Sequence, residues 1–244
     1  VLYIDGYLMD HPANRQAAQA ALEALPEGVQ VILDVSPVIG IPQGLPMRDV
    51  IVSMNHREAQ QIINQNAERG LEQGQELSRE QGRSQGQDQG HQGRSQGREA
   101  GLVASLVASL LGRPVVVRAG AAGAYFARPA GAKAGVSLTA PAPTPGAAPV
   151  GASAEGPVAA PVAANANTGA DVTYIPTPRV AAIDTNGAGD AHSGVLAAAL
   201  AQAIPLERAL LLANCAGALS TTLVGPASCP EREQIEAAAD ALAD

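Results

Sequence analysis

Aromatic side chains are scarce in this chain, which has one Phe, four Tyr and no Trp among 244 residues. The core must therefore be built from Ala, Val, Leu and Ile, so each buried position contributes less apolar area than an aromatic ring would. No apolar run reaches the length that spans a bilayer. The first residues, Val-Leu-Tyr-Ile-Asp, show no signal-peptide pattern. These absences predict a cytoplasmic location.

Cysteine, histidine and positive charge are limited as well. With no secretory signal, Cys215 and Cys229 indicate ordinary thiols in a reducing compartment rather than a disulfide framework. The four histidines show no metal-ligand spacing. The formal net charge is −8, whereas a nucleic-acid-binding surface is basic. The composition therefore argues against nucleic acid and membrane as partners.

Two low-complexity blocks interrupt an otherwise ordered pattern. Residues 70–101 contain eight Gln and eight Gly, and 29 of the 44 residues in 127–170 are Ala, Pro or Gly. Such segments bury too little apolar area to offset the entropy of ordering them. We therefore predict a disordered Gln/Gly-rich insertion over 70–101 and a flexible Ala/Pro/Gly-rich insertion over 127–170, both within one domain that covers residues 1–244.

Outside these blocks, short apolar runs alternate with amphipathic stretches, which predicts an α/β domain with a mainly parallel sheet. The expected strands are residues 1–4, 29–35, 49–54, 114–118, 124–127 and 171–183. The expected helices are residues 12–25, a helix from residue 55, and residues 102–111, 206–222 and 231–242.

The chain is organised around residues 184–194, which indicate a strand end, a glycine turn and the start of a helix. The amides of Gly187, Ala188, Gly189 and Asp190 would be unpaired donors of a helix N-terminus, which favours an anion. Asp184 and Asp190 bracket that position. An amide cradle with an acid beside it suits phosphoryl transfer. The alternative is an ordinary strand–turn–helix junction with a capping Asp.

The motif Asp-Thr-Asn-Gly-Ala-Gly-Asp at 184–190 resembles the Asp-Thr-x-Gly-Ala-Gly-Asp signature of the ribokinase-like, or PfkB, carbohydrate kinases. The resemblance implies a three-layer α/β/α fold and makes Asp190 the base that accepts the proton of the acceptor hydroxyl. It also implies that the amides of Gly187, Ala188 and Gly189 form the anion hole for the transferring phosphoryl group. His192 stands where the family often has an aromatic, so we expect it to face packing.

Two further stretches are similar to motifs of the same family. Asn55 and Glu58 match its Asn-x-x-Glu motif, which supports hydrated Mg²⁺ and phosphate, although the same spacing also makes a helix capping box. Residues 115–123 look like its strand ending in Thr-x-Gly-x-x-Gly, with Gly120 and Gly123 at the glycine positions. Arg118 replaces the Thr, and an Arg can reach phosphate instead. Taken alone, this pattern is that of a hairpin turn.

The remaining implied contacts lie in the last third of the chain. Residues 214–222 resemble the Ala-rich helix that closes the adenine pocket, so Asn214 either contacts the base or belongs to a plain core helix. The family also has a monovalent-cation site, which would take K⁺ here. By position that site would use the following groups: Asp184, the carbonyl of Asn186, and groups near Ser220, Leu223, Gly225 and Ser228.

The resemblance predicts transfer of a phosphoryl group from ATP, with Mg²⁺, to a hydroxyl of a sugar or nucleoside. It places Val1 near the middle of a full-length kinase, so the substrate-binding and lid half is expected to be missing. Two alternatives stay open: a nucleotide-binding remnant without catalysis, and a structural protein built around the low-complexity blocks. The predicted partners are ATP and a small sugar or nucleoside, with a homodimer as a further option.

Overall fold

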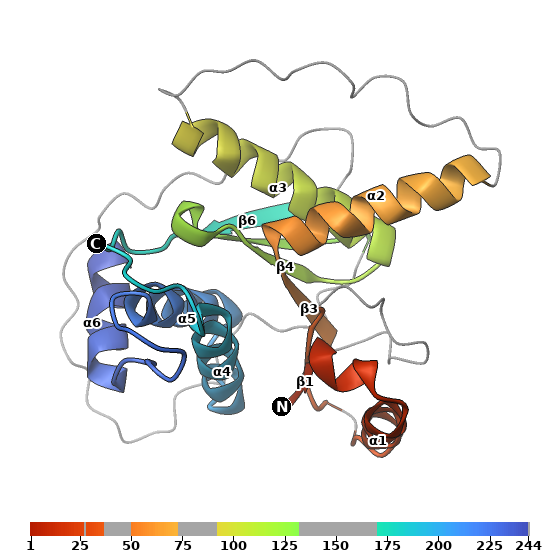
Figure 1. The fold of residues 1–244 in the computed structure, drawn as a ribbon, viewed down its shortest axis with the longest axis horizontal. Coiled ribbons are helices and arrows are strands. Elements are labelled where there is room, and N and C mark those ends of the chain that lie inside the picture. Colours follow the sequence, from red (N-terminus) through yellow and green to blue (C-terminus); the bar gives the residue numbers. More distant parts are fainter. Residues whose placement is uncertain (27, 37–49, 73–91, 132–169, 244) are drawn as a thin grey trace.

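The computed structural model describes residues 1–26, 28–36, 50–72, 92–131 and 170–243, which form a six-stranded sheet covered by helices on both faces (Figure 1). The strands follow one another across the sheet in chain order. Strands β1 to β4 are parallel, β5 is antiparallel to β4, and β6 is antiparallel to β5. The strands are β1 (Leu2–Asp5), β2 (Val31–Asp34), β3 (Val50–Asn55), β4 (Val115–Arg118), β5 (Ala124–Arg128) and β6 (Asp171–Ile175).

The central strands are apolar on both faces because both faces are covered. In β2, the residues Val31, Ile32 and Leu33 are all buried, and β3 and β4 show the same pattern. Continuous apolar runs of this kind are typical of parallel strands sandwiched between helices. Branched aliphatic side chains, not aromatics, therefore fill this core, as the composition predicts.

The helices divide into two groups, one on each face of the sheet (Figure 1). Side chains of α1, α2 and α3 pack in one apolar core, and those of α4, α5 and α6 pack in the other. The helices are α1 (Pro12–Glu23), α2 (His56–Glu72), α3 (Gln92–Leu111), α4 (Ala188–Ala201), α5 (Leu206–Ser220) and α6 (Arg232–Ala243), with short 3-10 helices η1 (Gly6–Asp10) and η2 (Gly120–Ala122). The predicted three-layer α/β/α architecture with a mainly parallel sheet is confirmed.

The Gln/Gly-rich block is narrower than predicted. Helix α2 continues to Glu72 and α3 begins at Gln92, so residues 92–101 are helical rather than disordered. The physical reason lies in the apolar face of α3, where Ala100 and Ala104 are both fully buried and stand one turn apart. Residues 73–91, the rest of the predicted insertion, lie outside the described residues.

The ends of the second block also belong to the ordered fold. Strand β5 runs to Arg128, with Ala127 buried, and Ala170 is buried just before β6. Residues 132–169 lie outside the described part of the chain. The strand predicted over 171–183 ends at Ile175, because Pro176 and Pro178 have no N–H to donate to a neighbouring strand. In the described ranges, no helix combines the length and apolar character needed to cross a membrane.

Candidate active site

A cleft opens at the carboxyl edge of the parallel strands, where the start of α4 faces the ends of β1, β2 and β4. Strand register pairs Asp5 with Asp34 and Asn55 with Arg118, so one edge of the sheet presents polar side chains from four strands. This edge is where open α/β sheets bind their ligands. The cleft is small, about 70 Å³, and is lined by Tyr3, Asp5, Tyr7, Asp34, Ser36, Arg118, Gly189 and Asp190.

The glycine turn before α4 is built as the sequence predicts. Gly187 caps the helix with φ +79°, a left-handed conformation, and a Cβ on it would lie 2.2 Å from the carbonyl oxygen of Pro226. Only glycine fits such a position without strain. The N–H of Ala188 makes a long, 3.4 Å bond to the carbonyl of Thr185. In the described part of the chain, no turn or cap bond uses the amides of Gly187, Gly189 or Asp190.

Asp190 lies in the first turn of α4, is exposed and lines the cleft. A helix N-terminus stabilises a carboxylate at this position, and its free amides attract a second anion. The structure therefore brings the predicted acid and the predicted anion hole to one end of one helix. This arrangement can hold a phosphate group beside a proton acceptor.

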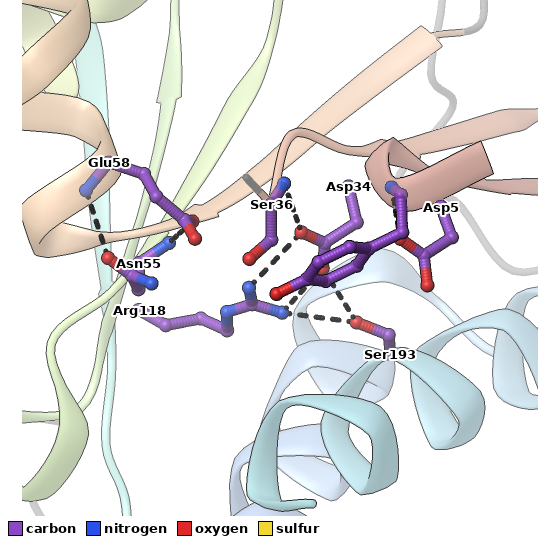
Figure 2. Close-up of polar contacts among 8 residues, drawn as sticks. Asp5, Asp34, Ser36, Asn55, Glu58, Arg118 and Ser193 are labelled. Atoms are coloured by element: carbon purple, nitrogen blue, oxygen red, sulfur yellow. Dashed lines mark hydrogen bonds and ion pairs between the residues drawn. The ribbon is translucent and has the colours of Figure 1, made fainter. Parts of the chain in front are cut away.

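Three polar side chains from distant parts of the chain meet beside this helix end (Figure 2). Arg118 Nη1 lies 2.8 Å from Asp34 Oδ2 and donates to Ser193 Oγ at 3.1 Å. The Ser193 hydroxyl in turn donates to Asp34 Oδ2, also at 3.1 Å. Arg118, predicted from its motif, thus reaches Asp34 and Ser193, neither of which sequence reasoning singled out. We call these three residues the Arg118 cluster.

Tyr3 borders the same cluster from β1. Burial, followed by the negative charge of Asp34, raises the pKa of Tyr3 to about 12, and a hydrogen bond with Ser193 acts in the opposite direction. The phenol is therefore neutral at physiological pH. It adds a hydroxyl to this edge of the cleft without adding charge.

Asn55 and Glu58 form a complete capping box at the start of α2 (Figure 2). The amide of Glu58 donates to Asn55 Oδ1 at 2.9 Å, and the amide of Asn55 donates to Glu58 Oε2 at 2.7 Å. The capping alternative is thus realised in the folded chain. A ligand role is compatible with it, because Asn55 is the register partner of Arg118 at the same sheet edge.

The two glycines after β4 make the turn into β5. Gly120 has φ +57° with open space around it, whereas a Cβ on Gly123 would lie 2.5 Å from the carbonyl oxygen of Ile175. Backbone conformation explains Gly120, whereas Gly123 has both a positive φ, +87°, and close packing against β6. The hairpin alternative is realised, since β4 and β5 are antiparallel neighbours.

Asn214 is buried in α5 and uses its side chain to hold the loop after β6. Its Nδ2 donates to the carbonyls of Ile175 and Pro176, at 3.1 and 2.9 Å. Both amide hydrogens are therefore taken within the chain. This geometry favours the core-helix alternative over contact with a nucleotide base.

The residues implied in a monovalent-cation site lie in one loop cluster next to the glycine turn. The two carboxylate oxygens of Asp184 accept hydrogen bonds from the amides of Asn186 and Gly225, at 2.9 and 3.0 Å. These two bonds lower the pKa of Asp184. Ser228 donates to the carbonyl of Ser220 at 3.1 Å. The cluster is thus rich in oxygen atoms and holds an ionised carboxylate.

His192 is buried between α4 and α5, as expected of a packing position. Burial, with a further contribution from the charge of Arg118, lowers its pKa from 6.5 to about 3. Between these two values the unfolded chain binds a proton that the folded chain does not. The free energy of unfolding is therefore expected to fall by about 2 kcal/mol from pH 7 to pH 5 through this residue alone.

His192→Phe should remove that sensitivity, because the new side chain does not titrate. Urea unfolding of both proteins at pH 7 and pH 5 measures the effect, and all other titrating groups cancel in the comparison. Equal losses of stability in the two proteins would contradict the assignment of a neutral, buried imidazole.

Comparisons with known proteins concern one segment of the chain and its overall fold. Residues 161–233 match the family model described as pfkB family carbohydrate kinase. No curated protein sequence matches the chain.

Solved structures match nearly the whole chain at low identity. A putative ribokinase from Agrobacterium tumefaciens matches with 18% identity and a TM-score of 0.54, over 98% of this chain and 55% of its own. Aminoimidazole riboside kinase from Salmonella enterica matches with 18% identity and a TM-score of 0.52, over 96% of this chain and 61% of its own. Fructokinase from Vibrio cholerae O395 matches with 17% identity and a TM-score of 0.50, over 97% of this chain and 59% of its own.

The fold is therefore that of the ribokinase-type carbohydrate kinases. The segment that matches the pfkB family model, residues 161–233, contains the glycine turn and Asp190. It spans between half and two thirds of the length of these solved structures.

Proposed function

We propose that this chain carries the phosphoryl-transfer half of a kinase that moves the γ-phosphoryl group of ATP to a hydroxyl of a sugar or nucleoside. One observation supports this above the others. The exposed carboxylate of Asp190 and the uncommitted amides of Gly187 and Gly189 lie together at the start of α4, on an open cleft.

In the proposed reaction, Asp190 accepts the proton of the acceptor hydroxyl while the hydroxyl oxygen attacks the γ-phosphorus. The bond from the γ-phosphorus to the bridging oxygen breaks, and ADP leaves. The amides at the start of α4 stabilise the negative charge on the phosphoryl oxygens. A carboxylate is a weak base, but it is sufficient because the transition state of phosphoryl transfer is loose and needs little early proton removal.

Mg²⁺ fits beside Asn55 and Glu58 as a hydrated ion. Glu58 is buried and one of its carboxylate oxygens is engaged by the capping box, so a full set of direct protein ligands is not offered there. Mg²⁺ commonly keeps several waters and is held by one or two carboxylates together with substrate phosphates. When bound, it neutralises charge on the ATP phosphates.

K⁺ is a second proposed ion, held near Asp184. The carboxylate there is ionised, and the neighbouring groups of Asn186, Ser220, Gly225 and Ser228 lie in the same loop cluster. A hard cation with oxygen ligands is the chemistry that such a set offers. Bound next to Gly187, it would stabilise the turn that presents the anion hole.

The acceptor class rests on relatives of the same fold. The Salmonella kinase was solved with aminoimidazole riboside and an ATP analogue, and the Vibrio fructokinase with fructose, ADP and a calcium ion. A nucleotide-binding module without catalysis is the second candidate, because the chain spans only part of such kinases. The cytoplasmic location and the homodimer remain predictions.

Two measurements on the chain test the proposal. Calorimetric titration with ATP and Mg²⁺ is expected to show one nucleotide site per chain. In a phosphorylation assay across pentoses, hexoses and nucleosides, turnover with at least one acceptor would support catalysis by this chain. Binding without turnover would favour the non-catalytic module, and no nucleotide binding would contradict both candidates.

A further inference from the structure

We propose that Arg118 binds the transferring phosphoryl group itself, and that Asp34 and Ser193 are positioning residues that hold its guanidinium there. This inference rests on the proposed phosphoryl transfer. It assigns Arg118 to the γ-phosphoryl group and not to the remainder of the nucleotide. It also gives a role to two residues that the family motifs described above do not contain.

The direction of the Arg118 side chain is the first observation. Its register partner on β3 is Asn55, yet the guanidinium extends away from Asn55 and Glu58 toward Asp34 on β2 and Ser193 on α4 (Figure 2). The side chain therefore passes the end of β3 and lies between the sheet edge and α4. The positive charge of Arg118 therefore lies beside α4, whose Asp190 lines the same cleft, and not at the start of α2.

The second observation is its distance from the anion hole. Arg118 Nη1 lies 4.0 Å from the point where a Cβ on Gly189 would stand. The guanidinium therefore lies on the open side of Gly189, in the helix turn whose amides are free, and both residues line the cleft. A phosphate bound by those amides would lie beside a fixed positive charge, and such preorganised donors are effective in stabilising transferring phosphoryl groups.

The third observation concerns the hydrogen-bond acceptors of the five guanidinium N–H groups of Arg118. Nη1 donates to Asp34 Oδ2 and Ser193 Oγ, and Nη2 donates to Asp34 Oδ1 through a longer bond of 3.4 Å. Among the described contacts, Nε–H and the second N–H of Nη2 have no acceptor. The Arg118 side chain is 15% exposed and Asp34 6%, so the guanidinium can be reached while its partner is enclosed.

Charge in the cleft gives the fourth observation. Of the described residues that line it, Arg118 carries the positive charge, while Asp5, Asp34 and Asp190 are acids. An incoming phosphate would be repelled by these carboxylates without a cation between them. Asp34 compensates Arg118 when the cleft is empty, and it fixes the planar fork in one orientation.

Titration of the chain with ADP and with the non-hydrolysable ATP analogue AMP-PNP, each with Mg²⁺, tests the proposal by calorimetry. Arg118→Thr is expected to weaken AMP-PNP binding about 10- to 100-fold, because charge-assisted bonds to the γ-phosphoryl group are lost. ADP binding should change less than about twofold, since ADP lacks that group. Arg208→Thr, which breaks another Arg–Asp pair between α5 and α6, is the matched control and should change neither.

Substitutions of the positioning residues, Asp34 and Ser193, should affect the binding of AMP-PNP and ADP differently. Asp34→Asn and Ser193→Ala should weaken AMP-PNP but not ADP binding, by about 3- to 10-fold, because each removes one support of the guanidinium. Asp34→Asn should add little on top of Arg118→Thr, since the two act through one group. A merely structural role would instead lower affinity for both nucleotides together with thermal stability.

The outcomes separate this proposal from the proposed function. If the native chain binds AMP-PNP and Arg118→Thr keeps that affinity within twofold, the inference is wrong and the proposed function stands. Equal losses for ADP and AMP-PNP would also overturn it, since they would place Arg118 on another part of the nucleotide. If the native chain binds neither nucleotide, both proposals fail. Should Arg118→Thr not fold, Arg118→Lys serves, and it should lose AMP-PNP affinity selectively because Lys lacks the planar fork.

Discussion

Asp190→Asn is expected to lower turnover about 10²- to 10⁴-fold with any acceptor that the chain phosphorylates, which is the usual contribution of a general base. The substitution keeps the size of the side chain and its place in the first turn of α4, but it removes the proton acceptor. ATP affinity should stay within about twofold, because the amides of the anion hole are unchanged. Steady-state kinetics and calorimetry with ATP measure the two effects separately.

Glu207→Gln provides the control for this prediction. Glu207 is likewise an exposed acid in the first turn of a helix, in this case α5, so the substitution reproduces the loss of one negative charge at a helix start. Its turnover should equal that of the native chain. Undiminished turnover in Asp190→Asn, with the control also unaffected, would show that another group accepts the proton.

Gly187→Ala is expected to destabilise the fold by about 2–4 kcal/mol. The left-handed backbone at φ +79° is unfavourable for alanine, and the new Cβ would lie 2.2 Å from the carbonyl oxygen of Pro226. The turn must therefore move, which displaces the amides that open α4. Urea unfolding gives the loss of stability, and titration with ATP should show a parallel loss of affinity.

Gly225→Ala separates the two causes. Gly225 also has a positive φ, +96°, but no atom lies within 4 Å of the position of its Cβ. Gly225→Ala should therefore destabilise the fold only through its backbone conformation, by about 1–2 kcal/mol. If Gly187→Ala lowers the free energy of unfolding no more than Gly225→Ala does, the close contact with Pro226 does not destabilise the fold.

Local patterns predicted most of the fold, because each element needs only nearby residues. The apolar run of β2 and the capping box at Asn55 are examples in which neighbours in sequence decide the structure. The ends of helices were less predictable in the low-complexity stretches. The helical start of α3 in a Gln/Gly-rich stretch depends on packing of Ala100 in the core beside the sheet, which composition alone does not reveal.

The candidate site was predictable only in its contiguous part. Residues 184–190 lie together in the sequence, so their glycines and acids predict an anion-binding turn. The Arg118 cluster joins residues 75, 84 and 159 positions apart, and no local pattern links them. One signal was available for Asp34: an acid at the carboxyl end of a parallel strand lies where such sheets bind ligands.

Side-chain partners also favour one of two alternatives that the sequence left open. From the sequence, Asn214 fits a contact with a nucleotide base and a position in a plain core helix equally well. Two hydrogen bonds to the backbone after β6 favour one of them.

The order of the strands across the sheet has a consequence for folding. Every strand pairs with the strand next to it in the chain, so the sheet can grow from its sequence neighbours outward. The contacts that complete the cleft are instead long-range and require α4, near the end of the chain, to dock on β2 and β4. The proposed nucleotide affinity should therefore depend on this docking, so a chain with an intact sheet but an undocked α4 would not bind.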